Sequence, residues 1–330
     1  MLFRAQLRLF AHIQMMAALE NAEEETLIGG QAVMEGVMMR SPRSYCVAVR
    51  KASGEIVTDE KRVPKLSEKY PAFRFPVLRG VGTLGQALGL GIKALQFSAN
   101  AALEDADPDA KKGAKKQEIT SWMLALNLGI SLLFFIFLYK FVPLYLTTAL
   151  GKVVPALQSR VPFNFCDGVI RMAIFVGFLY LISLWKDIRR VFEYHGAEHR
   201  VVFNFESGLP VTVENAQKFP TFHPRCGTSF LLVVMLVSIG IYALLPFDSF
   251  ALQFAGRVVL LPLVAGVSYE LIRYAARHRG SLLATLTAPG LWLQRITTRP
   301  PSDEQTAVAI EALERAMALE QAQGGRMVIA

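Results

Sequence analysis

Three residues that could act on or around a metal ion lie within the segment EYHGAEHR. His195, Glu198 and His199 form the pattern H-x-x-E-H. If the segment is helical, this spacing places His195 and His199 one turn apart on one face, with Glu198 at its edge. Two neutral imidazoles can hold zinc while a nearby carboxylate takes a proton from a water on the metal, and the residue order is that of the inverted zinc peptidases. The sequence therefore predicts a zinc site with Glu198 as general base.

A second pair of potential ligands follows in the segment PTFHPRCGTSF. His223 and Cys226 offer a ring nitrogen and a thiolate three residues apart. Because the chain has only five histidines and three cysteines, their concentration here is unusual. We predict that one zinc ion is bound by His195, His199, His223 and Cys226. A shell closed by all four would be structural, whereas three histidines and a water would leave a catalytic position, and the sequence leaves both open.

The elements that position these residues belong to a membrane protein. Hydrophobic residues make up 53% of the chain and charged residues 19%, which differs from an ordinary soluble domain. The apolar residues concentrate in segments close to the roughly 20 residues that cross a bilayer core. We therefore expect an α-helical polytopic membrane protein with about four transmembrane helices and a small cytoplasmic α+β portion. The four segments are Trp122–Val142, Gly168–Trp185, Thr228–Phe247 and Phe250–Ile272.

The basic residues predict the orientation of these segments. Lysine and arginine are frequent before the first segment, between the second and third, and after the fourth, which favours the cytoplasmic side for these regions. Both termini and the His/Cys segment are then cytoplasmic, in a multi-pass protein of the bacterial cytoplasmic membrane. The formal net charge of +8 is assigned to this orientation and to contact with the lipid bilayer. We expect no nucleic-acid partner, because no nucleic-acid-binding motif accompanies the charge.

The predicted divisions of the chain follow from these patterns. Residues 1–27 carry apolar residues at helical spacing, which predicts an amphipathic helix. Residues 28–120 contain a β-hairpin around Ala52–Gly54 and a semi-apolar interfacial or re-entrant helix at Val81–Ala102. A further short strand is expected from Gly208. The remaining divisions are 121–185 with two spans, 186–227 with the His/Cys cluster, 228–272 with two spans, and 273–330 as a cytoplasmic helical region with a capping box at Ser302 and Gln305.

Two charged residues in the fourth segment also lead to expectations. Glu270 lies at the depth of the His cluster, and Arg273 is its favoured partner over a bond to His195 or His199. Arg257 is expected to extend to the external surface. A transporter is the least favoured class, because most spans lack paired intramembrane charges.

Six stretches carry a resemblance to known sequences: IGGQAVMEGVMMRSP, GIKALQFSA, EYHGAEHR, HPRCGTSFLL, LPLVAGVSYELIR and PGLWLQRITTRPP. They resemble the YqhQ-like family of uncharacterised bacterial membrane proteins. The resemblance runs from about Ile28 to Ala312, so the first 25 residues and the tail after Gly324 lie outside it. Members of the family are sometimes labelled as predicted metal-dependent enzymes, and the resemblance implies the same expectation for the His and Cys residues above.

Two functions of different classes follow from the sequence. The first is a membrane-embedded zinc hydrolase that acts at the cytoplasmic interface on an unknown substrate, with Glu198 as general base. The second is a non-catalytic membrane scaffold or pore-forming homo-oligomer, in which the His/Cys cluster braces two spans. In the second case the substitution Glu198→Gln should have little effect.

Overall fold

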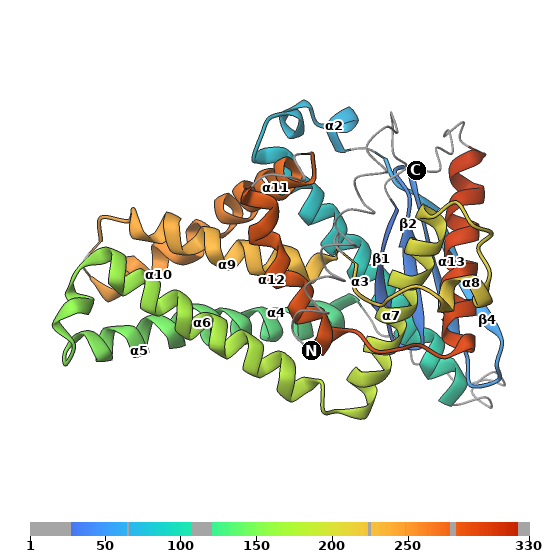
Figure 1. Cartoon of the computed structure of the whole chain (residues 1–330), viewed down its shortest axis with the longest axis horizontal. Coiled ribbons are helices and arrows are strands. Elements are labelled where there is room, and N and C mark those ends of the chain that lie inside the picture. The colour runs from blue at the N-terminus through green and yellow to red at the C-terminus, as the bar shows by residue number, and fades with distance from the viewer. Residues whose placement is uncertain are drawn as a thin grey trace.

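The computed structural model describes residues 28–64, 66–106, 121–223, 226–247, 249–277 and 282–322. The predicted amphipathic helix at residues 1–27 lies outside these ranges. The described chain is mostly helical and carries one small sheet (Figure 1). The sheet and its covering helices lie at one end of the molecule, and a group of long apolar helices extends from them to the other end.

The sheet is an antiparallel meander in which each strand pairs with the next in sequence. Its third and fourth strands form the predicted hairpin around Ala52–Gly54, which is confirmed. The first hairpin was not predicted, and its turn holds Glu35 at a positive φ of 53°. The strands are β1 (Gly29–Val33), β2 (Gly36–Arg40), β3 (Ser44–Arg50) and β4 (Ile56–Arg62).

Helices cover both faces of the sheet, which explains the nearly unbroken burial of β2 and β3. Val37 and Ala48 face α7 (Lys186–Glu206) and α13 (Asp303–Gln321) in one cluster. The alternate residues of the same strands pack on the other side against α3 (Leu78–Ala106). The result is a three-layer unit in which α7, the helix that carries H-x-x-E-H, and α13 lie side by side on one face of the sheet, and α3 lies on the other.

Helix α3 also connects the sheet to the apolar helices. Leu90 and Ala94 pack on the sheet. Near its start, Gly80 lies against the side chain of Tyr269 in α11 (Leu261–Arg277). The predicted helical segment Val81–Ala102 is therefore confirmed as a helix.

The long apolar helices correspond to the predicted spans, with differences in length. Two continuous helical stretches are long and apolar enough to cross a membrane, Leu126–Gly151 and Arg160–Ile182, within the described residues. The fourth predicted span is a pair, α10 (Phe250–Val259) and α11, bent by 50°, which brings the number to three if the pair is one span. The third, α9 (Gly227–Ala243), has 17 residues. By length and composition the structure thus provides two or three candidate spans where four were predicted.

The first candidate span contains an irregular turn. Helices α4 (Ser121–Ile136) and α5 (Val142–Gly151) are joined by a π-helical turn, η3 (Phe137–Phe141), and the second span is α6 (Arg160–Ile182). Helix α12 (Leu282–Thr297) packs beside α9, where Leu293 and Leu232 share an apolar cluster.

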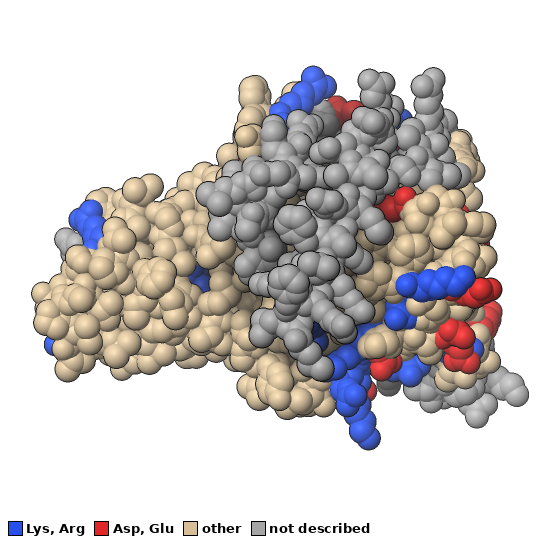
Figure 2. Space-filling model, viewed as in Figure 1, with Lys and Arg blue, Asp and Glu red and all other residues tan. Residues whose placement is uncertain are grey.

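The outer surface of the helical end is apolar. On the face shown in Figure 2, charged side chains gather around the sheet, and the helical end is almost free of them. Exposed apolar side chains on the first span include Leu126, Ile130, Leu132, Leu133, Phe134 and Phe137. Such a surface is costly in water and favourable in hydrocarbon.

Of two predictions about shorter elements, one is wrong and the other is confirmed. The strand expected from Gly208 is wrong: the segment is a loop followed by α8 (Val213–Gln217), which Thr212 caps by accepting from the Asn215 amide. The capping box of Ser302 and Gln305 is confirmed at the start of α13. Both outcomes follow from side-chain oxygens that satisfy the first amides of a helix.

Candidate metal centre

The H-x-x-E-H segment is helical, as predicted, and lies within α7. The buried face of α7 places Tyr194, Ala197 and Val201 in the core with the sheet and α13. That packing fixes the rotation of the helix, so that His195 and His199 lie one turn apart on an adjacent face. Their rings are 4.4 Å apart between centroids.

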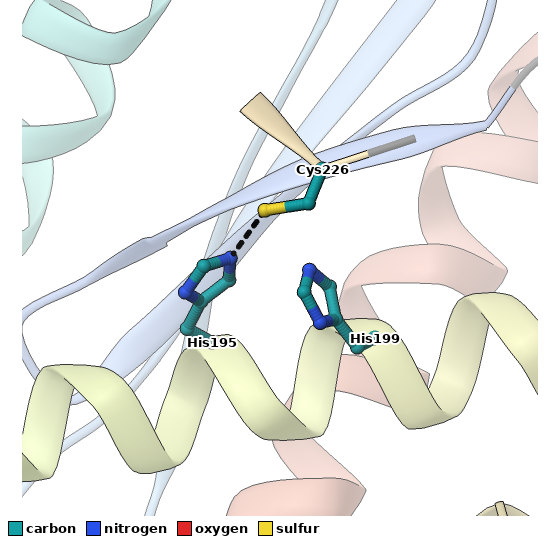
Figure 3. A group of neighbouring side chains, drawn as sticks. All are labelled: His195, His199 and Cys226. Carbon is teal, nitrogen blue, oxygen red and sulfur yellow. Dashed lines mark hydrogen bonds between the residues drawn. The ribbon is translucent and has the colours of Figure 1, made fainter. Parts of the chain in front are cut away.

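Cys226 completes a group of three potential ligands. It is the N-cap residue of α9, so the predicted meeting of two distant segments is observed. The ligand atoms of His195, His199 and Cys226 all lie within 4.8 Å of one another. The Cys226 Sγ is 3.3 Å from the His195 Nε2, and Figure 3 shows both rings directed from α7 towards the sulfur. The donor set of two imidazoles and a thiolate suits zinc.

Backbone carbonyls orient both histidine rings. The Nδ1–H of His195 donates to the Thr297 carbonyl at 2.7 Å, and the Nδ1–H of His199 donates to the Thr221 carbonyl. Since Nδ1 carries the proton in each ring, the lone pair is on Nε2, the atom nearer Cys226. Metal-binding histidines commonly have such a partner for the other nitrogen.

Glu198 lies beside this group and is almost fully buried. Its Oε2 is 3.4 Å from the His199 Nε2, and the backbone amide of Gly30 donates to its carboxylate. Burial raises the pKa of Glu198, and the neighbouring histidines act in the opposite direction. A carboxyl with a raised pKa next to a potential metal position is suited to accept a proton from water.

His223 lies next to the group without joining its three ligand atoms. Its ring centroid is 5.6 Å from that of His199, and its Nε2 is 3.4 Å from a carboxylate oxygen of Glu206. Gln294 holds the His223 backbone by accepting from its amide and donating to its carbonyl, each at 2.7 Å. Burial lowers the pKa of His223 to about 4. The structure thus brings His195, His199, Cys226 and Glu198 together. The ring of His223 lies next to that of His199 but outside the group of ligand atoms.

Several residues that support the site were not identified from the sequence. Thr221 and Thr297 act through their backbone carbonyls, which a sequence pattern does not reveal. Gly196 allows the α12–α13 linker to cross α7, because a Cβ there would lie 2.0 Å from the Arg299 carbonyl oxygen. Gly30 similarly makes room for Glu198. The glycine within H-G-A-E-H and the Gly29–Gly30 pair at the start of β1 are the sequence features that could have indicated this close packing.

The expected partners of Glu270 are wrong. Its carboxylate is paired with Arg79, whose Nε donates to it at 2.7 Å, and it accepts from the Val77 amide at 3.3 Å. These contacts fasten the start of α3 to α11. Glu35, in the turn between β1 and β2, forms an ion pair with Arg190 of α7, with an Nη2 to Oε2 distance of 2.6 Å.

Comparisons with known proteins identify the family of the chain. A family model described as "Protein of unknown function (DUF1385)" matches residues 75–319. The chain is 34% identical over 300 residues to the "Uncharacterized protein YqhQ" of Bacillus subtilis (strain 168), a match that covers 88% of this chain and 92% of that relative. No solved structure matches the chain. The chain belongs to the DUF1385 family of proteins of unknown function, in agreement with the resemblance of its sequence to YqhQ-like proteins.

Proposed function

We propose that the chain is a multi-pass protein of the bacterial cytoplasmic membrane, with the sheet, α7 and both termini on the cytoplasmic side. The apolar surface of the helical end and the lysine and arginine residues near the other end support this arrangement. In this arrangement α9 is inserted with a hydrophobic length of about 26 Å, which is slightly shorter than a typical bilayer core.

At the cytoplasmic end, we propose a zinc site formed by His195, His199 and Cys226. The observation that carries the proposal is the orientation of the two rings, in which both Nδ1 atoms bond to backbone carbonyls and both Nε2 atoms remain for a metal beside the Cys226 sulfur. Three protein ligands leave one tetrahedral position for a water or substrate, as in catalytic zinc sites.

The activity that this arrangement supports best is hydrolysis. A zinc ion held there would polarise a water molecule and lower its pKa. Glu198 would accept the proton of that water, because its carboxylate lies beside His199 and is held by the Gly30 amide. The raised pKa of Glu198 makes its carboxylate a stronger base than an exposed carboxylate.

A structural role of the cluster is the second candidate, and His223 is the observation that favours it. Its ring is adjacent to that of His199, so a rotation of the side chain could supply a fourth ligand. A closed shell of three histidines and one cysteine would brace α7 against α9 in a non-catalytic scaffold or homo-oligomer.

Metal content is the first test. The full chain, purified in detergent without chelator, is expected to contain about one zinc per chain by elemental analysis. The variants His195→Ala and Cys226→Ala should lose it, whereas Glu198→Gln and Arg189→Gln, a change of an exposed residue on the same helix, should retain it. A wild-type chain free of zinc would overturn the proposal.

An exogenous ligand then separates the catalytic from the structural role. After replacement of zinc by cobalt(II), acetohydroxamate is added as a probe of the open position. A saturable change in the visible spectrum is expected for the wild type and for His223→Ala. An unchanged wild-type spectrum, together with loss of metal from His223→Ala, would show a closed shell and favour the scaffold.

A further inference from the structure

The apolar helices enclose a second cluster of charged residues far from the candidate zinc site. Lys140 lies in the π-helical turn η3, Asp167 and Arg171 in α6, and Arg257 in α10. Each of the four side chains is at least nine-tenths buried. Lys140 and Arg171 lie near the middle of the two longest candidate spans. The expectation that Arg257 extends to the external surface is wrong, since only 1% of it is exposed.

One carboxylate serves both guanidinium groups. Arg257 donates to Asp167 at 2.8 Å, and Arg171 donates to the other oxygen of Asp167. The remaining partners are neutral: Arg257 donates to Asn164 at 2.8 Å, and Lys140 donates to the Tyr242 hydroxyl at 2.9 Å. Both carboxylate oxygens of Asp167 thus accept from arginines. Among the described residues, Lys140 donates to a hydroxyl and not to a carboxylate.

The cluster therefore carries an excess of formal positive charge. Among the described residues, three basic side chains face one carboxylate, which leaves two formal positive charges. Without Lys140, the two arginines would still leave one. The Nε atoms of Arg171 and Arg257 are buried and have no hydrogen-bond partner within the described part of the chain. Uncompensated charge and unmet donors are costly inside an apolar helical bundle, so the chemistry of this cluster suits an anionic partner.

A cavity reaches this cluster from the end of the helical bundle. It has a volume of about 360 Å³ and lies between α5, α6 and α10 and the last turn of α9. Arg257, Asn164 and Tyr242 line it from the cluster side, and Lys152 and Arg160 add basic groups. Leu245, Phe247 and Phe250 give it an apolar wall. This volume can hold a small polyatomic group, such as a phosphate, together with part of the molecule that carries it.

We propose that this cavity binds the phosphate group of an anionic molecule, with Arg257 as the main contact. Guanidinium groups present several donors in a plane, which matches the oxygens of a phosphate. The apolar wall suits a phospholipid headgroup whose chains leave along the helices, and free phosphate shares the same chemistry. The site is independent of the candidate zinc site, because Cys226 and Tyr242 lie at opposite ends of α9, about 24 Å apart along its axis.

Binding is tested on the full chain in two arms. In the first, delipidated protein in a neutral detergent is titrated with radiolabelled inorganic phosphate. In the second, protein in phosphatidylcholine nanodiscs with a minor fraction of phosphatidylglycerol is examined by native mass spectrometry for retained phosphatidylglycerol. Saturable binding of about one anion per chain in either arm is expected, and the arm that responds identifies the source of the phosphate.

Charge substitutions show whether the anion occupies this cavity. Asn164→Asp places a second carboxylate beside Arg257 and should weaken binding about tenfold or more, without lowering the melting temperature. Lys152→Glu reverses an exposed charge at the cavity and should weaken binding with no effect on folding. Arg189→Gln, on α7 at the other end of the molecule, should leave the affinity unchanged. Absence of binding in both arms, or binding that neither cavity substitution weakens, would overturn the proposal.

Discussion

Gly30 of β1 is in van der Waals contact with Glu198 of α7. A Cβ at position 30 would lie 2.6 Å from the Glu198 Cγ and 3.1 Å from its Oε1. The same glycine donates its amide hydrogen to the Glu198 carboxylate. One backbone position of the sheet therefore both holds the proposed general base and leaves room for it.

Gly30→Ala should displace the Glu198 side chain, shift the Met38 carbonyl of β2, which would lie 2.7 Å from the new Cβ, and leave zinc bound. In the cobalt-substituted protein, we expect the pH titration of the visible spectrum to shift, because the carboxylate no longer accepts from a water at the metal. Gly29→Ala is the matched control, since a Cβ at position 29 meets no atom within 4 Å. Identical titrations of the two variants would argue against contact between Glu198 and the water.

Gly196→Ala should weaken both the fold and the metal site. The added methyl group collides with the Arg299 carbonyl at 2.0 Å, so the α12–α13 linker, and with it the Thr297 carbonyl that orients His195, must move. We expect a loss of about 1–3 kcal/mol in the free energy of unfolding and a weaker zinc affinity, measured by chelator competition. Gly177→Ala, at a position of α6 with open space around it, should cause neither loss.

Cys226→Ser should remove the sulfur-to-cobalt charge-transfer absorption of the cobalt-substituted protein. The hydroxyl is nearly isosteric with the thiol, so α9 should keep its start and the melting temperature of the metal-free protein should change little. A charge-transfer band that persists in the variant would show that Cys226 is not a ligand.

The metal-free protein should lose stability as the pH falls from about 6.5 towards 4. Burial lowers the pKa of His199 and lowers that of His223 to about 4, so the unfolded chain binds more protons in this window and low pH favours it. For His223 alone the loss is on the order of 3 kcal/mol. Melting temperatures recorded with a chelator present provide the measurement.

His223→Gln isolates this contribution, because carboxylates near the site titrate in both proteins. The variant should show a shallower decline than the wild type. Equal slopes would mean that folded His223 already carries a proton and pairs with Glu206, whose carboxylate lies 3.4 Å away.

The sequence correctly predicts the features that depend on residues close together in the chain. The hairpin of β3 and β4, the helix that carries His195 and His199, and the capping box at Ser302 all depend on residues close in sequence. The strand predicted from Gly208 is wrong, because its alternating β-formers are also compatible with a loop that ends at Thr212, the N-cap of α8. The bilayer-length runs were also located, but only chain geometry could show that one is bent by 50° and another has 17 residues.

The sequence by itself determined the apolar segments, the family resemblance and the candidate ligands, because these depend on residue type and spacing. Only the tertiary structure decided that Cys226 joins His195 and His199 while His223 stands aside, and that Glu270 pairs with Arg79, 191 residues away. It alone brought Lys140, Asp167 and Arg257 together from three helices. Such contacts are set by how rigid helices rotate and cross as their apolar faces pack, and that rotation is a property of the whole fold.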